Sequence, residues 1–180
     1  MHAQQIGLLV VMALGGAAVI GSYIRGFSSH PGSAESLWGG VSGGLRYFNY
    51  AAMIGAAVGF FLFTFWLLFV VDPGNLEVFG RYGYWMFYVI ILLILIPSAL
   101  WMPFLFAYLD SSSGAWWFAV RLVLVLVGVG ALALLAAILT VSPKETGAAY
   151  WLAVTGAALF CIQTAVLDMF IWPALFKGSR

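Results

Sequence analysis

The stretch WWFAVRLVLVLVGVGALALLAAILTV at residues 116–141 decides the fold, because its only charged side chain is Arg121. About 20 consecutive apolar residues form an α-helix long enough to cross the hydrocarbon core of a bilayer. Inside that core, backbone polar groups can pair only within a helix or a closed barrel. The stretch therefore predicts a membrane-spanning helix.

Four further apolar stretches of spanning length surround this one. They cover residues 6–24, 48–71, 84–109 and 150–176. The segments between the stretches are short, apart from residues 25–47. We therefore expect an all-α fold: a polytopic membrane protein built as a five-transmembrane-helix bundle, with residues 1–180 forming a single membrane domain.

The composition supports a chain that is embedded in lipid. Hydrophobic residues make up 64% of the 180 residues and charged residues only 7%, whereas soluble domains carry about 25% charged residues. The formal net charge is +1, and the basic residues form no stripe of the kind that binds nucleic acid. The single cysteine, Cys161, excludes an internal disulfide and is expected to pack as a small core residue.

The distribution of Lys and Arg predicts the orientation, because these residues are enriched in cytoplasmic loops. Only Arg81 and Lys144 fall on the side of the second and fourth loops. The side of the first loop, the third loop and the C-terminus holds five basic residues: Arg25, Arg46, Arg121, Lys177 and Arg180. We expect an integral protein of a bacterial inner membrane, with the N-terminus outside and the C-terminus in the cytoplasm.

The residue patterns that enzymes and metal sites need are missing from the sequence. No HExxH, no GxSxG and no phosphate-binding glycine loop occurs. Both histidines, His2 and His30, lie outside the expected spans, so an intramembrane haem would lack axial histidine ligands. We expect a protein that is not an enzyme, with no metal site. The sequence identifies no cofactor; a porphyrin or haem is a candidate only as a bound ligand.

Asp168 is the one acidic residue deep inside an apolar stretch. An ionisable side chain at such a depth costs about 2.5–3.5 kcal/mol on insertion scales and usually faces the protein interior. Arg121 enters the preceding stretch from the same expected side and to a similar depth. We expect these two residues to pair, either as an ion pair that locks two helices or as the polar wall of a ligand cavity.

Three of the stretches carry a stripe of mixed polar and aromatic residues at helical spacing. The stripes are Asn49, Met53, Ala56 and Phe60; Pro97, Trp101, Phe104 and Tyr108; and Cys161, Thr164, Asp168 and Trp172. Such stripes fit helix–helix packing, and their mixed composition also fits a ligand pocket. Pro97 and Pro103 are expected to bend the third helix and to open space inside the bundle.

Three segments are similar to segments of a known membrane-protein family. Residues 14–26, LGGAAVIGSYIRG, are similar to its first helix, which ends in a Tyr-x-Arg-Gly run. Trp101-Met-Pro-Phe104 is similar to its Trp-Pro-(Pro)-x-Phe segment, and residues 141–153 to its fourth loop and the start of its fifth helix. The chain thus resembles the tryptophan-rich sensory protein / translocator protein family. That family's first-loop motif, Pro-x-Trp-x-Pro-Pro, is absent here, where the loop holds only Pro31 and Trp38.

The resemblance implies a five-helix pocket for tetrapyrroles, sterols or other hydrophobic ligands. At the matching positions it implies that Trp101, Pro103 and Phe104 line the pocket, that Trp151 belongs to the start of the fifth helix, and that Trp38 acts as a lid. Asp168 has no counterpart in the family. Together with the residues singled out above, the candidate ligand-binding set is Trp38, Asn49, Trp101, Pro103, Phe104, Arg121, Trp151, Asp168 and Trp172.

The expected function is therefore non-enzymatic binding of a hydrophobic ligand in an intramembrane cavity. Two alternatives stay open. Glycines suited to close helix contacts favour a small structural subunit or assembly factor of a larger membrane complex; they are Gly15, Gly16, Gly21, Gly128 and Gly130. Asp168 with Arg121 favours a proton-coupled transporter. The expected partners are membrane lipid, a hydrophobic small molecule, and a second copy or a larger membrane complex, with no nucleic acid.

Overall fold

The computed structural model describes residues 1–143 and 146–176 and consists mainly of long helices. Their bounds are α1 Ala3–Ser29, α2 Gly43–Phe65, α3 Trp85–Ser111, α4 Gly114–Leu139 and α5 Ala148–Cys161. Helix α2 continues as the π-helical turn η2, Trp66–Val70. Helix α5 continues as the π-helical segment η3, Ile162–Ile171, and then as α6, Trp172–Leu175. A short 3-10 turn, η1, covers Ser36–Trp38.

Five helices of the described residues are long and apolar enough to cross a membrane. This confirms the expected all-α, five-helix membrane protein. Most helices extend beyond the apolar stretches from which they were predicted. Helix α1, for example, covers Ala3–Ser29, whereas the apolar stretch covers residues 6–24. Helix α3 is helical through both Pro97 and Pro103. Three basic residues that enter the orientation argument, Lys144, Lys177 and Arg180, lie outside the described residues.

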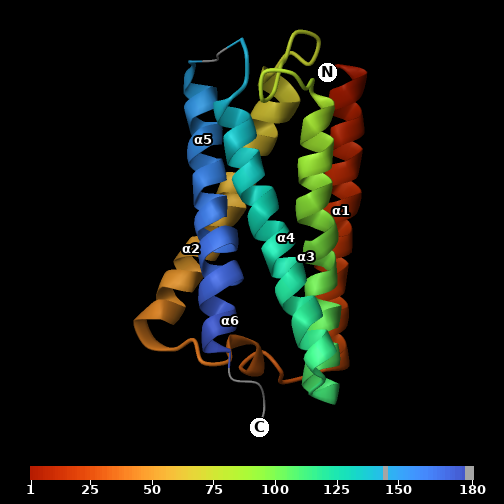
Figure 1. Cartoon of the computed structure of the whole chain (residues 1–180), viewed down its shortest axis with the longest axis vertical. Helices are drawn as coiled ribbons and strands as arrows, with labels where there is room; N and C mark the ends of the chain where they lie inside the picture. The colour runs from red at the N-terminus through yellow and green to blue at the C-terminus, as the bar shows by residue number, and fades with distance from the viewer. Residues whose placement is uncertain (144–145, 177–180) are drawn as a thin grey trace.

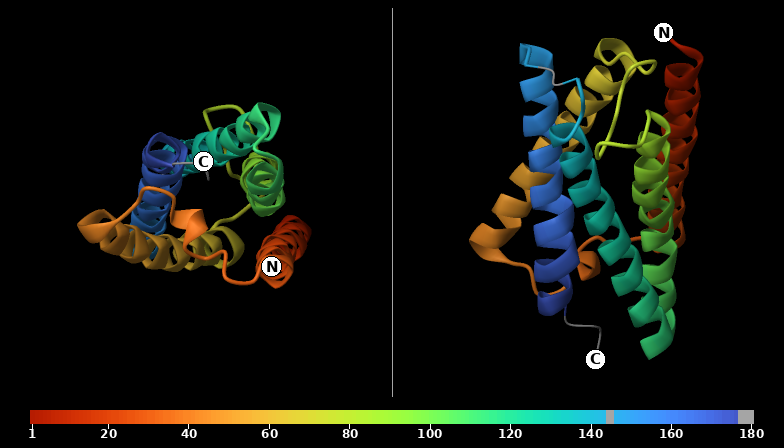
Figure 2. Two further views of the ribbon diagram at one scale, coloured as in Figure 1. Left: turned by 90° about the horizontal axis from the view of Figure 1, so that it is seen from below. Right: turned by 45° about the horizontal axis from the view of Figure 1, so that its top comes forward.

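The helices form a ring of neighbours that does not follow their order in the sequence. Helix α1 packs along α3, α3 along α4, α4 along α5 and η3, and α5 along α2. Figure 1 shows α1 and α3 side by side, with α4 between them and the α5–α6 rod. The view from below in Figure 2 shows the ring. Helix α1 contacts η2, the continuation of α2, whereas the beginning of α2 slants away from α1 (Figure 1).

The two ends of the bundle differ. Residues 30–42 run beneath one end, close to where α6 ends, and we call it the first-loop end (Figure 1). The opposite end, which we call the N-terminal end, holds residue 1 and the second and fourth loops. Those two loops are joined there, because Glu77 and Ser142 exchange backbone hydrogen bonds of 2.8 and 2.9 Å.

Several polar contacts fasten the N-terminal end. The π-helical turn η2 changes the backbone pairing at the end of α2, and side chains take up the freed carbonyls. Gln5 Nε2 of α1 donates to Val71 O at 2.9 Å, and Tyr84 Oη donates to Leu67 O at 2.9 Å. These bonds attach α1 and the start of α3 to the end of the α2–η2 rod.

Helices α2 and α5 cross at two glycines, with backbone against backbone. A Cβ placed on Gly59 would lie 2.3 Å from Gly156 O, and one on Gly156 would lie 2.6 Å from Gly59 O. Small residues at such crossings let membrane helices approach closely, which increases their dispersion contacts. The crossing fixes α2 and α5 relative to each other above the first-loop end.

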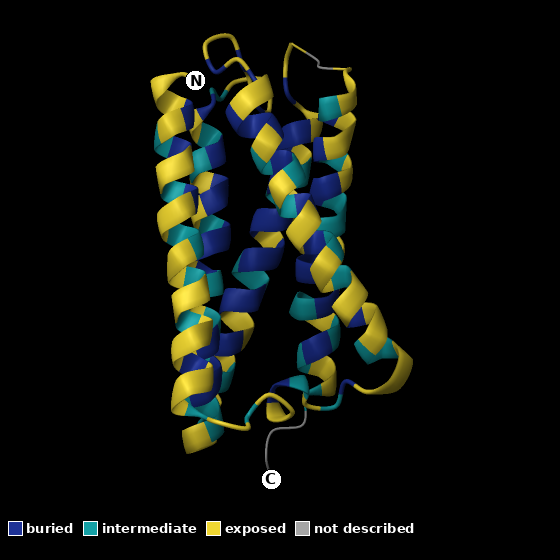
Figure 3. Cartoon of the chain, turned by 180° about the vertical axis from the view of Figure 1, so that it is seen from behind, coloured by how far each residue is buried: buried dark blue, intermediate teal, exposed yellow. Residues whose placement is uncertain are grey.

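The burial pattern is that of a bundle whose outer face meets lipid. Figure 3 shows buried residues on the facing sides of the helices and exposed residues along the outside, most extensively on α1. Exposed side chains there are apolar, such as Leu14, Ile20 and Ile24, each more than 60% exposed. Cys161 is buried with a free thiol, as expected for a small core residue.

Candidate functional site

Three polar side chains meet inside the bundle, in the half nearer the first loop. Asn49 comes from α2, and Gln163 and Asp168 come from η3. Gln163 Nε2 donates to Asp168 Oδ1 at 2.8 Å and lies 3.4 Å from Asn49 Oδ1. Asn49 and Gln163 are 4% and 7% exposed, and Asp168 is half-buried. Polar groups in a membrane helix usually face the interior in this way.

The π-helical geometry of η3 brings Gln163 and Asp168 together. In an α-helix, residues five apart differ by about 140° around the axis, because each residue turns about 100°. A π-helix closes its turn between residues i and i+5, so that residues five apart stand nearly above one another. The spacing of the predicted stripe assumed an α-helix, so it included Thr164 and omitted Gln163.

Three buried polar atoms around this group have no hydrogen-bond partner within the described residues. They are Asn49 Nδ2, Gln163 Oε1 and the indole Nε1 of Trp101. A buried donor or acceptor without a partner costs about 1–3 kcal/mol. Two of the three atoms are donors and one is an acceptor, so a polar group that both accepts and donates would satisfy them.

Aromatic side chains form the wall beside the polar group. The rings of Tyr23 and Trp101 have centroids 5.7 Å apart, and those of Trp101 and Trp172 have centroids 5.9 Å apart. Tyr23 comes from α1, Trp101 from α3 and Trp172 from α6, one helical turn after Asp168. Aromatic walls with a few polar groups are typical of small-molecule sites.

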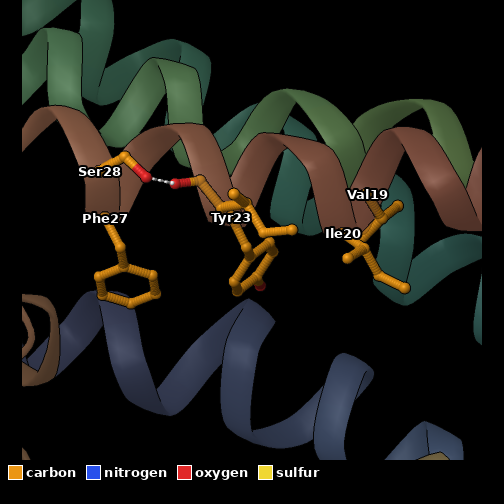
Figure 4. A pocket seen from close by; sticks show the side chains of 6 residues that line it. Val19, Ile20, Tyr23, Phe27 and Ser28 are labelled. Carbon is orange, nitrogen blue, oxygen red and sulfur yellow. Dashed lines mark hydrogen bonds between the residues drawn. The ribbon is translucent and has the colours of Figure 1, made fainter.

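An open hollow of about 600 Å³ adjoins this wall. Its lining comes from the second half of α1: Val19, Ile20, Tyr23, Ile24, Phe27 and Ser28. In Figure 4, the rings of Tyr23 and Phe27 point from α1 toward the rod that ends in α6. Tyr23 therefore belongs both to the hollow and to the aromatic wall, and it joins the hollow to the polar side chains.

The first loop closes the bundle below the site. Trp172 Nε1 donates to Leu37 O at 2.9 Å, which ties the loop to α6. Gly39 and Gly40 press on Phe176 and Leu175, where a Cβ would lie 2.6 and 2.3 Å from the nearest atoms.

A second group of contacts holds the outer part of this loop. Arg46 donates two hydrogen bonds to Glu35, of 2.8 and 2.9 Å. These bonds lower the pKa of the fully exposed Glu35 carboxyl below its usual value. The guanidinium of Arg46 lies 4.8 Å from the Trp38 ring, which in turn packs edge-on against Tyr50 with centroids 4.8 Å apart. Trp38 is thus positioned over the end of the bundle, and its role as a lid stays a prediction.

The structure corrects the expected pair of Arg121 and Asp168. Among the described residues, Arg46 pairs with Glu35, and His2 and His30 contact Asp72 and Asp110, pairs that are ionic only when the histidine is protonated. Arg121 lies on an exposed face of α4, while Asp168 faces Gln163. Similar depth along two helices does not bring side chains together when they point in different directions around their axes.

Three other candidates lie apart from the polar group. Pro103 is exposed, because its neighbours Met102 and Leu105 occupy the buried face of α3. Phe104 packs against Trp116 of α4, with ring centroids 5.6 Å apart. Trp151 is 56% exposed in the first turn of α5, at the N-terminal end. Asn49, Trp101, Asp168 and Trp172 are the candidates that the structure brings together.

Sequence reasoning missed Gln163 and Tyr23. Gln163 carried a usable signal, because an amide inside a spanning stretch is costly unless it has a partner. Tyr23 belongs to the Tyr-x-Arg-Gly run of the family resemblance, but that run was not connected with the pocket, since tyrosines near helix ends are common in membrane proteins. Within the described residues, no group of three His, Cys, Asp or Glu side chains is arranged to hold a metal ion.

Comparison of the chain with protein-family models, curated proteins and solved structures gave no match.

Proposed function

We propose that this membrane protein is a non-enzymatic receptor or carrier for a hydrophobic ligand with a polar group. The ligand lies between α1 and the α5–α6 rod, with its apolar part in the hollow and its polar part against Asn49, Trp101 and Gln163. The observation that carries the proposal is the set of unpartnered buried atoms, Asn49 Nδ2, Gln163 Oε1 and Trp101 Nε1, beside an open aromatic-lined hollow. Ser33 Oγ and Trp66 Nε1 are also unpartnered, so the gathering of three such atoms beside one aromatic wall, and not their presence alone, supports the proposal.

The resemblance of the sequence to the tryptophan-rich sensory protein / translocator protein family agrees with this proposal. It implies tetrapyrroles, sterols or other hydrophobic molecules as the ligands to test first. Trp101 is the residue on which both lines of reasoning converge, since it lies in the matching Trp-Met-Pro-Phe segment and holds one of the unpartnered donors.

Tryptophan fluorescence of the purified protein in dodecyl maltoside micelles tests the proposal. Haemin, protoporphyrin IX and a quenching sterol analogue are titrated separately, and at least one is expected to quench in a saturable way. Trp101→Phe keeps an aromatic ring but removes the indole donor. A neutral hydrogen bond contributes about 1 kcal/mol, so this variant is expected to bind about fivefold more weakly.

Trp151→Phe is the matched control, because it removes an exposed tryptophan at the opposite end of the bundle. It is expected to bind the ligand as tightly as the unchanged protein. Absence of saturable quenching by all three probes, with the unchanged protein folded and helical, would exclude tetrapyrroles and sterols as the ligands. The proposal itself is overturned if cationic and neutral pyrene probes also fail to bind.

A second function, as a subunit of a larger membrane complex, is favoured by the outer face of α1. A Cβ added to Gly16 or Gly21 would have no atom within 4 Å, so a partner helix has room to approach there. The other three glycines expected to contact a partner instead pack against side chains of this chain: Gly15 against Leu95, Gly128 against Met169 and Gly130 against Ile94. Purification in a mild detergent followed by native mass spectrometry separates the two functions, because a stoichiometric partner supports the subunit.

A further inference from the structure

The Asp168 carboxylate has no positively charged partner in the described part of the chain. The nearest polar contact is the hydrogen bond of 2.8 Å from Gln163 Nε2, which is neutral. Arg121 points elsewhere, and the described ion pairs all involve other acids. An ionised carboxylate away from water is stable only when a cation or several hydrogen bonds compensate its charge. Within the described residues no basic side chain supplies that charge, so a bound cation is the group that would keep Asp168 ionised.

The surroundings of Asp168 suit an organic cation. Trp172 follows Asp168 by one helical turn, and Trp101 packs between the rings of Trp172 and Tyr23. Aromatic rings attract ammonium groups through their negative faces, and the attraction increases where water is excluded. A carboxylate flanked by aromatic rings is the combination that binds an alkylated ammonium group.

The unpartnered atoms add a second, independent indication. Asn49 Nδ2 and Trp101 Nε1 are donors that point to no acceptor in the described chain, and Asn49 is 4% exposed. A ligand with an oxygen a few bonds from its ammonium nitrogen would satisfy them while the nitrogen faces Asp168. Asp168 precedes Leu175, the last residue of α6, by seven residues. The carboxylate therefore lies about 10 Å along the rod from the first-loop end.

We propose that the ligand of this site is a cationic amphiphile, whose ammonium group is held by Asp168 with Tyr23, Trp101 and Trp172. This inference rests on the proposed ligand-binding function and narrows it, because porphyrin propionates would be repelled by the same carboxylate. The ammonium belongs either to a free amphiphile or to a lipid headgroup, and the chemistry of recognition is the same for both.

The test uses two probes of equal shape, (pyrenylmethyl)trimethylammonium and its neutral isostere neopentylpyrene, in which carbon replaces the nitrogen. Energy transfer from tryptophan to pyrene is measured in dodecyl maltoside micelles, which contain no ammonium group, and protein-free micelles supply the background. The ammonium probe is expected to bind about tenfold more tightly than the isostere. In Asp168→Asn, the affinities for the two probes are expected to agree within about threefold.

The controls keep the outcomes distinct. Asp72→Asn changes an exposed acid at the N-terminal end and is expected to retain the preference for the ammonium probe. If Asp168→Asn does not fold, as judged by circular dichroism and gel filtration, Tyr23→Leu replaces it. That variant retains the carboxylate and is expected to lose about threefold in affinity for the ammonium probe relative to the isostere.

Each result has one meaning. Equal binding of both probes to the unchanged protein, or a preference that survives Asp168→Asn, overturns the inference and leaves the proposed function standing. Binding of neither probe, together with no quenching by the hydrophobic ligands above, overturns both. When the preference is present, displacement of the ammonium probe by added phosphatidylcholine, but not by dioleoylglycerol, assigns the ammonium to a lipid headgroup. No displacement by either lipid assigns it to a free amphiphile.

Discussion

Replacement of Gly59 by alanine is expected to destabilise the bundle at the crossing of α2 and α5. The added Cβ would lie 2.3 Å from Gly156 O, 2.9 Å from Gly156 C and 3.0 Å from Gly156 Cα. All three are backbone atoms, so no side-chain rotation relieves the contact. Reaching an ordinary separation of 3.4 Å requires the two helices to move apart by about 1 Å, since 3.4 − 2.3 = 1.1.

The cost follows from overpacking and from lost contacts. Forcing one extra carbon into a packed interior costs about 1–3 kcal/mol. Gaps of 0.5–1 Å also remove about a quarter to a half of the dispersion energy of the atoms that separate. We therefore expect Gly59→Ala to lower the free energy of unfolding by about 2–3 kcal/mol.

Unfolding by sodium dodecyl sulfate in mixed micelles, followed by circular dichroism, measures this change. Gly55→Ala is the matched control, because Gly55 lies one turn earlier on the same helix and its Cβ would make only an ordinary contact, 3.7 Å from Leu159 Cδ2. It is expected to be neutral or slightly stabilising, since alanine favours the helix. If both variants unfold within about 0.5 kcal/mol of each other, well below the 1–3 kcal/mol expected of overpacking, the close crossing is refuted.

Three further predictions concern the first-loop end. Trp172→Phe removes the hydrogen bond from Trp172 Nε1 to Leu37 O. Because that bond contributes about 1 kcal/mol to holding the loop, backbone amide exchange in residues 36–41 is expected to become about fivefold faster, as measured by mass spectrometry. The pKa of Glu35 is lowered by the hydrogen bonds from Arg46, so their stabilisation of the loop is present above the usual pKa of a glutamate. It is lost as the pH falls through the lowered pKa, and a carboxyl NMR titration is expected to show the Glu35 pKa returning toward its usual value in Arg46→Gln. A green fluorescent protein fused after residue 180 is expected to fluoresce in bacteria, because it folds in the cytoplasm, and a dark fusion with an active periplasmic reporter at the same place contradicts the orientation.

The spanning helices were predictable because the bilayer imposes a length and a composition that few other structures share. The ends were less predictable, since residues such as Gln4 and Ser28 continue α1 without adding to its apolar pattern. The order of neighbours in the ring was not predicted at all. It depends on contacts such as the Gly59–Gly156 crossing, which small residues permit but do not specify.

Residues of the candidate site could be predicted where the cost of a polar group in lipid determines that it faces the interior. They could not be predicted where contact depends on the direction of a side chain around the helix axis. Asp168 stood out because an ionisable group in an apolar stretch is costly, and Asn49 because it belongs to a stripe at helical spacing; both face the interior. The pairing with Arg121 was wrong because depth does not determine direction around a helix axis. Gln163 was missed because the stripe assumed α-helical spacing, whereas Ile162–Ile171 is π-helical; its amide inside an apolar stretch was the signal that could have identified it.

The arrangement separates stability from binding along the length of the bundle. The N-terminal half holds the polar fastenings of η2, with Gln5 on Val71 and Tyr84 on Leu67, and the close crossing of α2 and α5. The other half holds the unpartnered atoms of Asn49, Trp101 and Gln163, the open hollow, and a loop tied to α6 by one hydrogen bond. Among the described residues, the N-terminal half leaves Trp66 Nε1 of η2 unpartnered. A protein can tolerate a costly, incompletely paired region only if another region supplies the stability, and binding regions are drawn from the less stable part. Asn49→Leu is therefore the change that separates the two properties. It removes a buried unpartnered donor and loses only the 3.4 Å contact with Gln163 Nε2, which keeps its bond to Asp168. The free energy of unfolding is expected to rise while the affinity for the ligand falls.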